Sequence, residues 1–442
     1  MKQVATVVLF FVVVCTSHAQ TSPMWQLLPD APRTSRYNDV YFVSPTVGWV
    51  VSGTAEIYRT LDGGASWQLQ FRRTTAHFRS VAFVDSMNGW VGNVGVGEFG
   101  TTDASVLYRT SNAGNTWIPV TQFDGPDPVG LCGMSVVNDS TVVGVGRVRG
   151  PAFFIKTTDG GETWTSKDMS AHAAGLIDVH FFDTNTGFAA GLTNSNHEQS
   201  SGIILYTEDG GETWEERFRT TRTGEWIWKL SFPTDEVGYA SLQRNSQSPI
   251  YFLKTTDGGA TWEEKLFRSD YYFVQGIGFI SEDEGWIGGN SSEPSYHTTD
   301  GGETWEPDPI GQRMNRFRFL TDSFGYAVGR QVHRYGQASA VAIGDEAEVP
   351  SSLQLDPNYP NPFQTSTTVR YTLPEASPVQ VAVFDVLGRR VTELVNETQT
   401  TGTHTIVWNG TNRQGELVGT GIYFLQIHAG DRTESHTMVL MR

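Results

Sequence analysis

Short runs of alternating apolar and polar residues, separated by glycine-rich turns, fill the chain from residue 24 to about residue 337. Val81-Ala82-Phe83-Val84 and Ile277-Gly278-Phe279-Ile280 are two such runs. After each run a polar turn leads to a glycine and then an aromatic residue, as at Gly48-Trp49 and Gly238-Tyr239. Period-two alternation bounded by turn residues is typical of β-strands. The pattern therefore predicts an all-β protein.

An eight-residue motif, Thr-x-Asp-Gly-Gly-x-Thr/Ser-Trp, recurs along the same region. Full copies occupy residues 60–67, 157–164, 207–214, 255–262 and 298–305, and a degenerate copy at 110–117 has Asn112 and Ala113 in place of Asp and the first Gly. The tryptophans that end the copies are 43 to 50 residues apart. Such a period suits one four-stranded propeller blade per repeat.

A seventh unit lacks this motif. Strands are predicted at residues 317–320, 325–326 and 331–335, and no box follows them. At the other end of the mature chain, Met24-Trp25-Gln26-Leu27-Leu28 resembles the strand that follows a box. We predict a seven-bladed β-propeller in which this N-terminal strand completes the last blade, because ring closure removes an open sheet edge.

The repeated motif resembles the BNR/Asp-box of sialidases, sortilin-type receptors, xyloglucanases and photosystem II assembly-factor propellers. The resemblance implies an Asp-box propeller over residues 20–337, and its assembly-factor-like and sortilin-like members imply binding rather than a reaction. Each box Asp is expected to accept hydrogen bonds from its own turn, and each box Trp to wedge between adjacent sheets. These structural residues are Asp62, Trp67, Trp117, Asp159, Trp164, Asp209, Trp214, Asp257, Trp262, Asp300 and Trp305.

The N-terminus has the pattern of a secretory signal peptide. Lys2 precedes an apolar run, and Ser17-His18-Ala19 places small residues before a cleavage site, so residues 1–19 are predicted to be removed. The alternative is a permanent anchor, for which the apolar run is short. Cys15 lies in the leader, which leaves Cys132 as the cysteine of the mature chain and excludes a disulfide or a multi-cysteine zinc site.

The last part of the chain has a different composition. Residues 338–352 form a predicted linker, after which Tyr359-Pro360-Asn361-Pro362-Phe363, Val407-Trp408-Asn409-Gly410 and Gly421-Ile422-Tyr423-Phe424 follow in order. This set resembles the type IX secretion (Por) C-terminal sorting domain, an immunoglobulin-like β-sandwich. The resemblance implies that the type IX export machinery reads residues 353–442 and delivers the protein to the cell surface or the medium. An ordinary accessory sandwich is the alternative.

The net charge of −17 argues against nucleic acid as a partner. Outside the leader no apolar stretch is long enough for a transmembrane segment. The ten histidines show no metal-binding spacing, and no phosphate-binding loop or nucleophile elbow occurs, so no cofactor and no metal are predicted.

A sialidase-like or xyloglucanase-like hydrolase is the enzyme alternative. The Phe/Tyr-Arg-Ile-Pro signature typical of sialidases is absent. The paired carboxylates Glu215-Glu216 and Glu263-Glu264 follow box tryptophans, where neighbouring side chains point to opposite faces of a strand. The sequence therefore favours no catalytic residue.

Charge is expected to be sorted between the two faces of the propeller. The turns between the first and second strands of each blade and the box turns share one face, which we call the Asp-box face, and both sets of turns are acidic. The connections on the opposite face, the loop face, mix arginines with aromatic residues, the side chains enriched at binding hot spots. An unknown surface protein or glycan is the expected partner there. The candidate ligand-binding residues are Arg72, Arg73, Arg79, Arg217, Arg219, Arg222, Trp226, Trp228, Arg268, Tyr271, Tyr272, Arg313 and Arg316.

Overall fold

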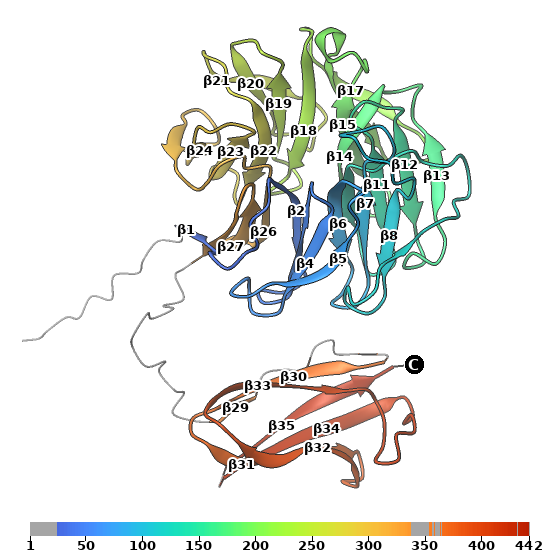
Figure 1. Cartoon of the computed structure of the whole chain (residues 1–442), viewed down its shortest axis with the longest axis vertical. Helices are drawn as coiled ribbons and strands as arrows, with labels where there is room; N and C mark the ends of the chain where they lie inside the picture. The colour runs from blue at the N-terminus through green and yellow to red at the C-terminus, as the bar shows by residue number, and fades with distance from the viewer. Residues whose placement is uncertain are drawn as a thin grey trace, which may run out of the picture. The chain divides into compact units, whose positions relative to one another are not determined.

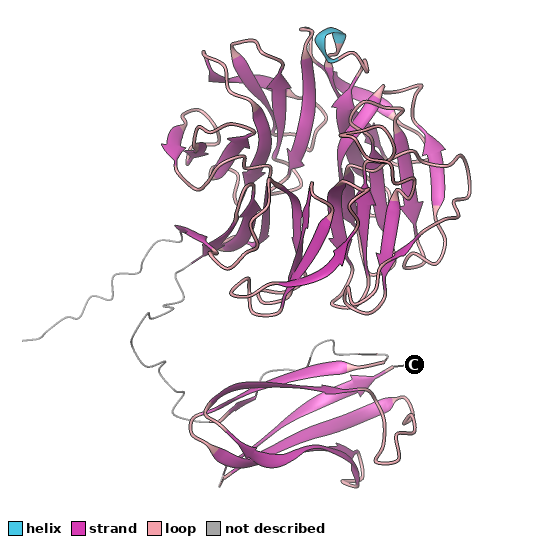
Figure 2. Ribbon diagram, in the orientation of Figure 1, coloured by secondary structure: helices cyan, strands magenta, loops and turns pink. Residues whose placement is uncertain are grey.

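The computed structural model divides the chain into two compact units, residues 1–339 and 340–442. It describes residues 24–336, 353–355, 358, 363, 365–430 and 432–441. The predicted signal peptide, the predicted linker and Tyr359 to Pro362 of the first C-terminal motif lie outside these residues. Strands joined by turns and loops make up the described chain, and its one helical element is the short turn η1 (His197–Gln199) (Figure 2). No helix among the described residues is long and apolar enough to cross a membrane.

Seven four-stranded antiparallel sheets form the propeller, and strands are numbered in chain order (Figure 1). The first three blades contain β2 (Tyr37–Phe42), β3 (Gly48–Ser52), β4 (Glu56–Thr60) and β5 (Gln68–Arg72), then β6 (Phe78–Phe83), β7 (Gly89–Asn93), β8 (Leu107–Thr110) and β9 (Ile118–Pro119), then β10 (Gly133–Val136), β11 (Val142–Gly146), β12 (Phe153–Thr157) and β13 (Thr165–Asp168). Blades four to six contain β14 (Gly175–Phe181), β15 (Gly187–Leu192), β16 (Gly202–Thr207) and β17 (Glu215–Arg219), then β18 (Glu225–Ser231), β19 (Gly238–Arg244), β20 (Ile250–Thr255) and β21 (Glu263–Arg268), then β22 (Val274–Phe279), β23 (Gly285–Gly289), β24 (Ser295–Thr298) and β25 (Glu306–Asp308).

The seventh blade closes the ring with the N-terminal strand. β26 (Arg316–Thr321), β27 (Phe324–Val328) and β28 (Val332–Gly336) form its inner part, and β1 (Met24–Leu27) pairs antiparallel with β28 from Met24↔Gly336 to Leu27↔His333. In Figure 1, β1 lies in blue beside the late strands β26 and β27. The predicted seven-bladed fold and its closure are confirmed.

The glycine of each Gly-aromatic corner is dictated by a phenylalanine on the innermost strand. Gly187 pairs with Phe181, and a Cβ atom on Gly187 would lie 2.4 Å from the Phe181 ring. Gly48 and Gly89 meet Phe42 and Phe83 in the same way, with the same 2.4 Å approach. A real Cβ cannot come so close, so these corners need glycine.

The aromatic residue after the glycine joins one blade to the next. Trp49 stacks on Phe83 of the second blade with ring centroids 3.5 Å apart, and Tyr239 stacks on Phe279 of the sixth blade at 3.4 Å. These rings are fully buried, which makes each corner a strong apolar contact between sheets.

The Asp-box turn is held by its own side chains. Asp62 accepts hydrogen bonds from the backbone N–H of Ser66 at 2.8 Å and from its hydroxyl at 2.6 Å, while Thr60 donates to Asp62 at 2.7 Å. Asp159, Asp209, Asp257 and Asp300 make the same contacts in their boxes.

Box turns lie on the same face as the turns between the first and second strands. Gly63 N–H donates to Thr46 O at 2.9 Å, and Gly210 N–H donates to Asn185 O at 2.7 Å. The sorting of turns into two faces therefore holds in the structure.

Four box tryptophans, Trp164, Trp214, Trp262 and Trp305, meet an aromatic residue of the preceding blade, whereas Trp67 and Trp117 meet Phe42 and Phe83 of their own blades. Trp164, 2% exposed, meets Trp90 edge-on with ring centroids 5.9 Å apart. Trp25 of β1 meets Trp286 in the same edge-on manner at 5.4 Å, so it stands where the seventh blade has no box tryptophan.

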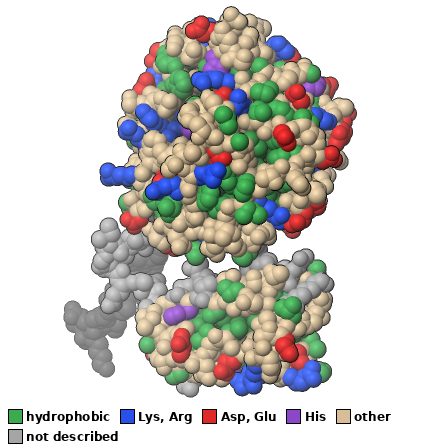
Figure 3. Space-filling model, turned by 45° about the vertical axis from the view of Figure 1, so that its right-hand side comes forward, with side chains coloured by type: hydrophobic (Ala, Val, Ile, Leu, Met, Phe, Trp, Pro, Cys, Tyr) green, Lys and Arg blue, Asp and Glu red, His purple; other side chains and the backbone are tan. Residues whose placement is uncertain are grey.

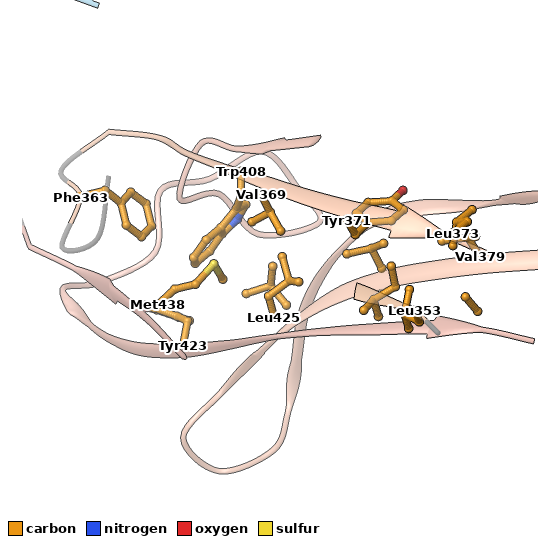
Figure 4. Packing of buried hydrophobic residues seen from close by; sticks show 14 of the residues in the cluster. Leu353, Phe363, Val369, Tyr371, Leu373, Val379, Trp408, Tyr423, Leu425 and Met438 are labelled. Atoms are coloured by element: carbon orange, nitrogen blue, oxygen red, sulfur yellow. The ribbon is translucent and has the colours of Figure 1, made fainter. Parts of the chain in front are cut away.

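The second unit is a two-sheet β-sandwich. One sheet has the order β29-β30-β33 and the other β32-β31-β34-β35, with β29 (Gln354–Leu355), β30 (Thr367–Leu373), β31 (Ser377–Asp385), β32 (Arg390–Gln399), β33 (Gly402–Trp408), β34 (Gly421–Ala429) and β35 (Arg432–Leu440). Trp408, Phe363 and Tyr423 pack together between the sheets (Figure 4). This core confirms the predicted immunoglobulin-like sandwich.

Candidate functional site

The innermost strands of the seven blades surround a central channel. Near the start of each innermost strand, one extra residue lies opposite the second strand of the same blade. In five blades this residue forms a β-bulge. In the other two, Cys132 and Asn315 donate a backbone hydrogen bond to the residue of the second strand that pairs with the residue after them. We call these equivalent residues the bulge ring. They are Asn38, Arg79, Cys132, Ile177, Trp228, Gln275 and Asn315, and all are buried. A β-bulge changes the direction of the side chain it carries, so these residues form a layer of their own beside the channel.

The next layer of the channel is a buried ion-pair network. Arg316 donates to both carboxylate oxygens of Asp178 at 3.0 and 2.7 Å and to Asp39 at 3.1 Å. Lys229 Nζ lies 3.5 Å from Asp178, and Arg318 contacts both oxygens of Asp39 at 3.2 Å. These five side chains come from β2, β14, β18 and β26, so the network ties four blades together.

Burial and charge shift the pKa values in this layer in opposite directions. Burial by itself would raise the pKa of Asp178, but Arg316 and Lys229 outweigh it and hold that pKa well below its usual range. Burial, together with the charge of Arg316, lowers the pKa of Lys229 to about 7. Asp178 is therefore a stable anion at neutral pH.

A funnel of about 750 Å³ opens where the innermost strands end, at the Asp-box face. Asp178 and Arg316 are among its lining residues, as are the half-buried rings of Tyr41, His180 and Phe232. His180 stacks on Phe232 with ring centroids 4.9 Å apart, and the Arg318 guanidinium lies 5.2 Å from the Tyr41 ring centroid. Aromatic walls with a few polar groups are typical of binding sites.

The funnel has few groups able to transfer protons. Its lining carboxylates are Asp178, which is committed to Arg316, and the exposed Asp322. Burial lowers the pKa of His180 to about 4, so this imidazole is neutral at physiological pH. Among the described residues no cluster of three or more His, Cys, Asp or Glu is placed to hold a metal ion.

Most of the arginines predicted to bind a ligand take part in ion pairs on the outer strands. Arg72 pairs with Glu56, Arg73 with Asp103, Arg217 with Glu215 and Arg219 with Glu216. Arg222 contacts Glu225 and Glu264, and Arg268 contacts Asp270 and Glu293. The structure thus spreads these six arginines over several blades and does not gather them into one site.

The remaining candidates lie around the channel or inside the fold. Trp226 and Trp228, 3% and 5% exposed, pack with Cys132 and Ile177 in an apolar cluster, and Tyr272 is 1% exposed. Tyr271 is 38% exposed. The channel positions belong to Arg79, Arg316 and Trp228, while Arg313 is half-buried just before β26.

Several residues of the channel were not among the sequence candidates. Asp39, Asp178 and Lys229 were missed, and they occupy the same position as the candidate Arg316, nine residues before the glycine of the Gly-aromatic corner in their blades. That constant offset is a signal that could have brought them together. The bulge-ring residues precede them by one position.

Charged side chains are unevenly distributed over the propeller surface. In the view of Figure 3, Lys and Arg side chains are interspersed with apolar ones over much of the propeller, and acidic side chains gather along its right-hand margin. Asp183, Asp235 and Asp322, in turns after the innermost strands, are exposed. They place negative charge around the mouth of the funnel.

Comparison with known proteins supports both folds. Family models match at residues 296–307, as a BNR/Asp-box repeat, and at residues 362–432, as an FlgD Ig-like domain. Comparison with curated proteins gave no match.

Two solved structures of YCF48 are similar to the propeller. YCF48 bound to D1 peptide is 18% identical over 72% of this chain and 96% of that chain, with a TM-score of 0.53. YCF48 from Cyanidioschyzon merolae is 17% identical over 71% and 98%, also at 0.53. The GH74 xyloglucanase from Xanthomonas campestris is 11% identical over 84% of this chain and 63% of that chain, at 0.53. The chain thus carries a BNR/Asp-box repeat and shares the propeller fold with structures that include a xyloglucanase and a protein described as bound to a peptide.

Proposed function

We propose that the mature chain is an exported, non-catalytic binding propeller, delivered by the type IX pathway to the cell surface or the medium. In this proposal the C-terminal unit is the sorting domain that the type IX export machinery recognises. The propeller provides the binding surface for an unknown surface protein or glycan.

The chemistry of the funnel carries the non-catalytic part of the proposal. Glycoside hydrolysis generally uses two carboxyl groups, one of them able to donate a proton. Asp178 accepts from both Arg316 nitrogens and from Leu230 N–H at 3.0 Å, and its pKa lies far below the range of a general acid. The funnel therefore has the walls of a binding site and lacks a free acid–base pair of carboxyl groups among its lining residues.

The funnel indicates what kind of group it would accept. Tyr41, His180 and Phe232 can stack on a flat apolar surface such as a sugar ring or an aromatic side chain. Exposed Asp183 and Asp235 lie in the turns beyond these walls and favour a partner that carries positive charge next to that group. A protein segment with an apolar anchor flanked by basic residues meets both conditions.

The loop face remains a second candidate binding surface in the same proposal. Its six peripheral arginines would have to exchange their present carboxylate partners for a ligand, which reduces the gain from binding. Among the candidates beside the channel, Arg79 forms no ion pair with a described carboxylate, so it would not have to give up such a partner to bind a ligand.

The fold of the C-terminal unit and its FlgD Ig-like match support the sorting role. Val386 and Leu387, 63% and 74% exposed at the turn between β31 and β32, offer apolar side chains that a receptor could read. Deleting residues 353–442 is expected to retain the propeller in the periplasm of a type IX-competent bacterium. Normal surface delivery of the truncated chain would contradict the sorting role.

The binding role can be tested on the full mature chain with one substitution inside the funnel and one outside it. Val136 and Val120 are both half-buried, and Val136 lines the funnel while Val120 follows the outer strand β9. Immobilised wild-type protein would be screened against a glycan array and a displayed peptide library. Val136→Arg is expected to abolish the binding found, and Val120→Arg to retain it.

The same variants separate binding from hydrolysis. Wild-type protein would be incubated with xyloglucan and with a sialoside, and released reducing sugar would be measured. We expect no release. Sugar release that disappears in Val136→Arg and persists in Val120→Arg would instead establish a hydrolase with its active site in the funnel.

A further inference from the structure

We propose that the mouth of the central channel on the loop face is a binding site for one small carboxylate, held between the guanidinium groups of Arg36 and Arg79. This inference concerns the opposite end of the channel from the funnel and does not depend on the function proposed above.

Two guanidinium groups converge on a single neutral acceptor at this point. Arg36 Nε donates to Asn38 Oδ1 at 3.1 Å, and Arg79 Nη1 donates to the same oxygen at 3.4 Å. Arg36 also contacts the side-chain oxygens of Gln275 at 2.6 Å and Asn315 at 3.5 Å. Three members of the bulge ring, Asn38, Gln275 and Asn315, therefore present amide oxygens to these cations, and Arg79 is itself a member of the ring.

Neither arginine forms an ion pair with a carboxylate within 4.0 Å among the described residues. Arg79 is 1% exposed, and its Nε is buried without a hydrogen-bond partner in this part of the chain. Its guanidinium lies over the Trp228 ring, 5.2 Å from the centroid. A buried cation without a counter-charge is costly, whereas a paired one is tolerated.

The carboxylates of the neighbouring layer are already committed. Asp39 is shared by Arg316 and Arg318, and Asp178 by Arg316 and Lys229. The described side chains of the two layers thus include five basic groups and two carboxylates, and Arg36 and Arg79 are the two basic groups that pair with neither carboxylate.

The local pKa values are consistent with this excess of positive charge. Burial and the nearby cations Arg79 and Arg313 lower the pKa of Arg36 to about 9. His77, whose Nε2 lies 3.1 Å from Asn38 Nδ2, has a pKa lowered to about 3 by burial and by the same two arginines, Arg79 and Arg36. An anion between the guanidinium groups would relieve the repulsion that these shifts express.

The residue types favour a carboxylate over other anions. A guanidinium group presents a planar fork of donors that matches the two oxygens of a carboxylate. The side-chain oxygens of Asn38, Gln275 and Asn315 are neutral acceptors for Arg36 at the same level, so a carboxylate would replace a neutral acceptor by a charged one. A free carboxylate and the terminal carboxylate of a peptide share this chemistry.

Thermal unfolding of the full mature chain in a low-salt zwitterionic buffer tests the site, with sodium acetate as the probe. Acetamide, a neutral molecule of the same shape, and sodium chloride at equal ionic strength are the controls. Acetate is expected to raise the Tm in a saturable manner, acetamide to leave it unchanged, and chloride to raise it less. An equal effect of acetamide, or an equal saturable effect of chloride, would overturn the assignment.

Matched arginine variants locate the effect. Arg36→Gln and Arg79→Gln are each expected to weaken the apparent acetate affinity at least tenfold, and Arg33→Gln, at an exposed arginine in the same segment, to leave it unchanged. Because Arg36→Gln removes a repulsive charge, its Tm without acetate should equal or exceed that of the wild type. A lower Tm by the same amount with and without acetate would show a purely structural role and contradict the proposal.

Two further measurements apply if Arg79→Gln does not fold. In the wild-type chain, acetate should shift the side-chain Nε–H resonances of Arg36 and Arg79 and leave that of Arg33 in place, and the absence of such shifts would refute the site. Triglycine and triglycine amide then distinguish the source of the carboxylate. Competition with acetate by the free acid alone indicates a peptide terminus, and competition by neither indicates a small free carboxylate.

Discussion

Replacing Asp178 by asparagine is expected to destabilise the propeller strongly. Asp178 accepts two hydrogen bonds from Arg316 and lies 3.5 Å from Lys229 Nζ, and all three side chains are almost completely buried. The substitution preserves shape and removes the negative charge that both cations face. Breaking a buried ion pair by removing one partner typically costs about 3–5 kcal/mol, because it leaves an uncompensated buried charge. We expect a loss of this size in the free energy of unfolding.

The loss can be measured by urea unfolding at pH 7, followed by tryptophan fluorescence. Glu216→Gln is the matched control, since Glu216 pairs with Arg219 at a site where both side chains are more than 40% exposed. Such a surface pair contributes at most about 1 kcal/mol. The double variant Asp178→Asn/Lys229→Met should recover about 1–3 kcal/mol relative to Asp178→Asn, because it also removes one orphaned cation. If Asp178→Asn costs no more than Glu216→Gln, or if Lys229→Met gives no recovery, the network does not stabilise the channel as described.

Three further outcomes are expected. Trp164→Ala should lower the free energy of unfolding by about 3–5 kcal/mol in urea titrations, because Trp164 is buried against Trp90, and an unchanged midpoint would contradict its wedge role. Gly187→Ala should cost about 1–3 kcal/mol by calorimetry, since its Cβ would meet the Phe181 ring, whereas Gly419→Ala, with open space around it, should cost little. Stability should fall as the pH drops from 6.5 towards 4, by up to about 1.4 kcal/mol per pH unit for each of His77, His180 and His333, because the unfolded chain binds protons that the folded one excludes; a flat stability–pH curve over this range would refute it. Burial lowers their pKa values to about 3 for His77 and to about 4 for His180 and His333.

The blades could be predicted because their signals are local. The hydrogen bonds made by the Asp and Thr side chains of a box turn join residues at most four positions apart, such as Asp62 and Ser66. The Gly-aromatic corner depends on one cross-strand contact within a hairpin, such as Gly187 with Phe181. Closure by residues 24–28 could be inferred because one box strand was missing and one spare strand remained.

The channel could not be predicted in the same way. Asp39, Asp178 and Arg316 are 138 or more residues apart, and each one alone is a polar residue in a strand. Some surface partners are also distant in the sequence, since Arg73 pairs with Asp103, 30 residues away, and Arg222 with Glu264, 42 residues away. From the sequence alone, an arginine in a loop is interpreted as free to bind a ligand, because the carboxylate that pairs with it is identified only by the tertiary structure.

The amino-acid sequence by itself determined the number of blades and the way the ring closes, because these follow from short-range turn chemistry repeated at a regular period. The second unit was indicated by the end of that repeat, and its immunoglobulin-like fold by the resemblance of its ordered motifs to a known domain family. Only the tertiary structure decided which charges are paired, which are left without a counter-charge, and where the funnel opens. These properties arise when seven innermost strands meet around one axis. There, burial makes each charge depend on neighbours that are far away in the sequence.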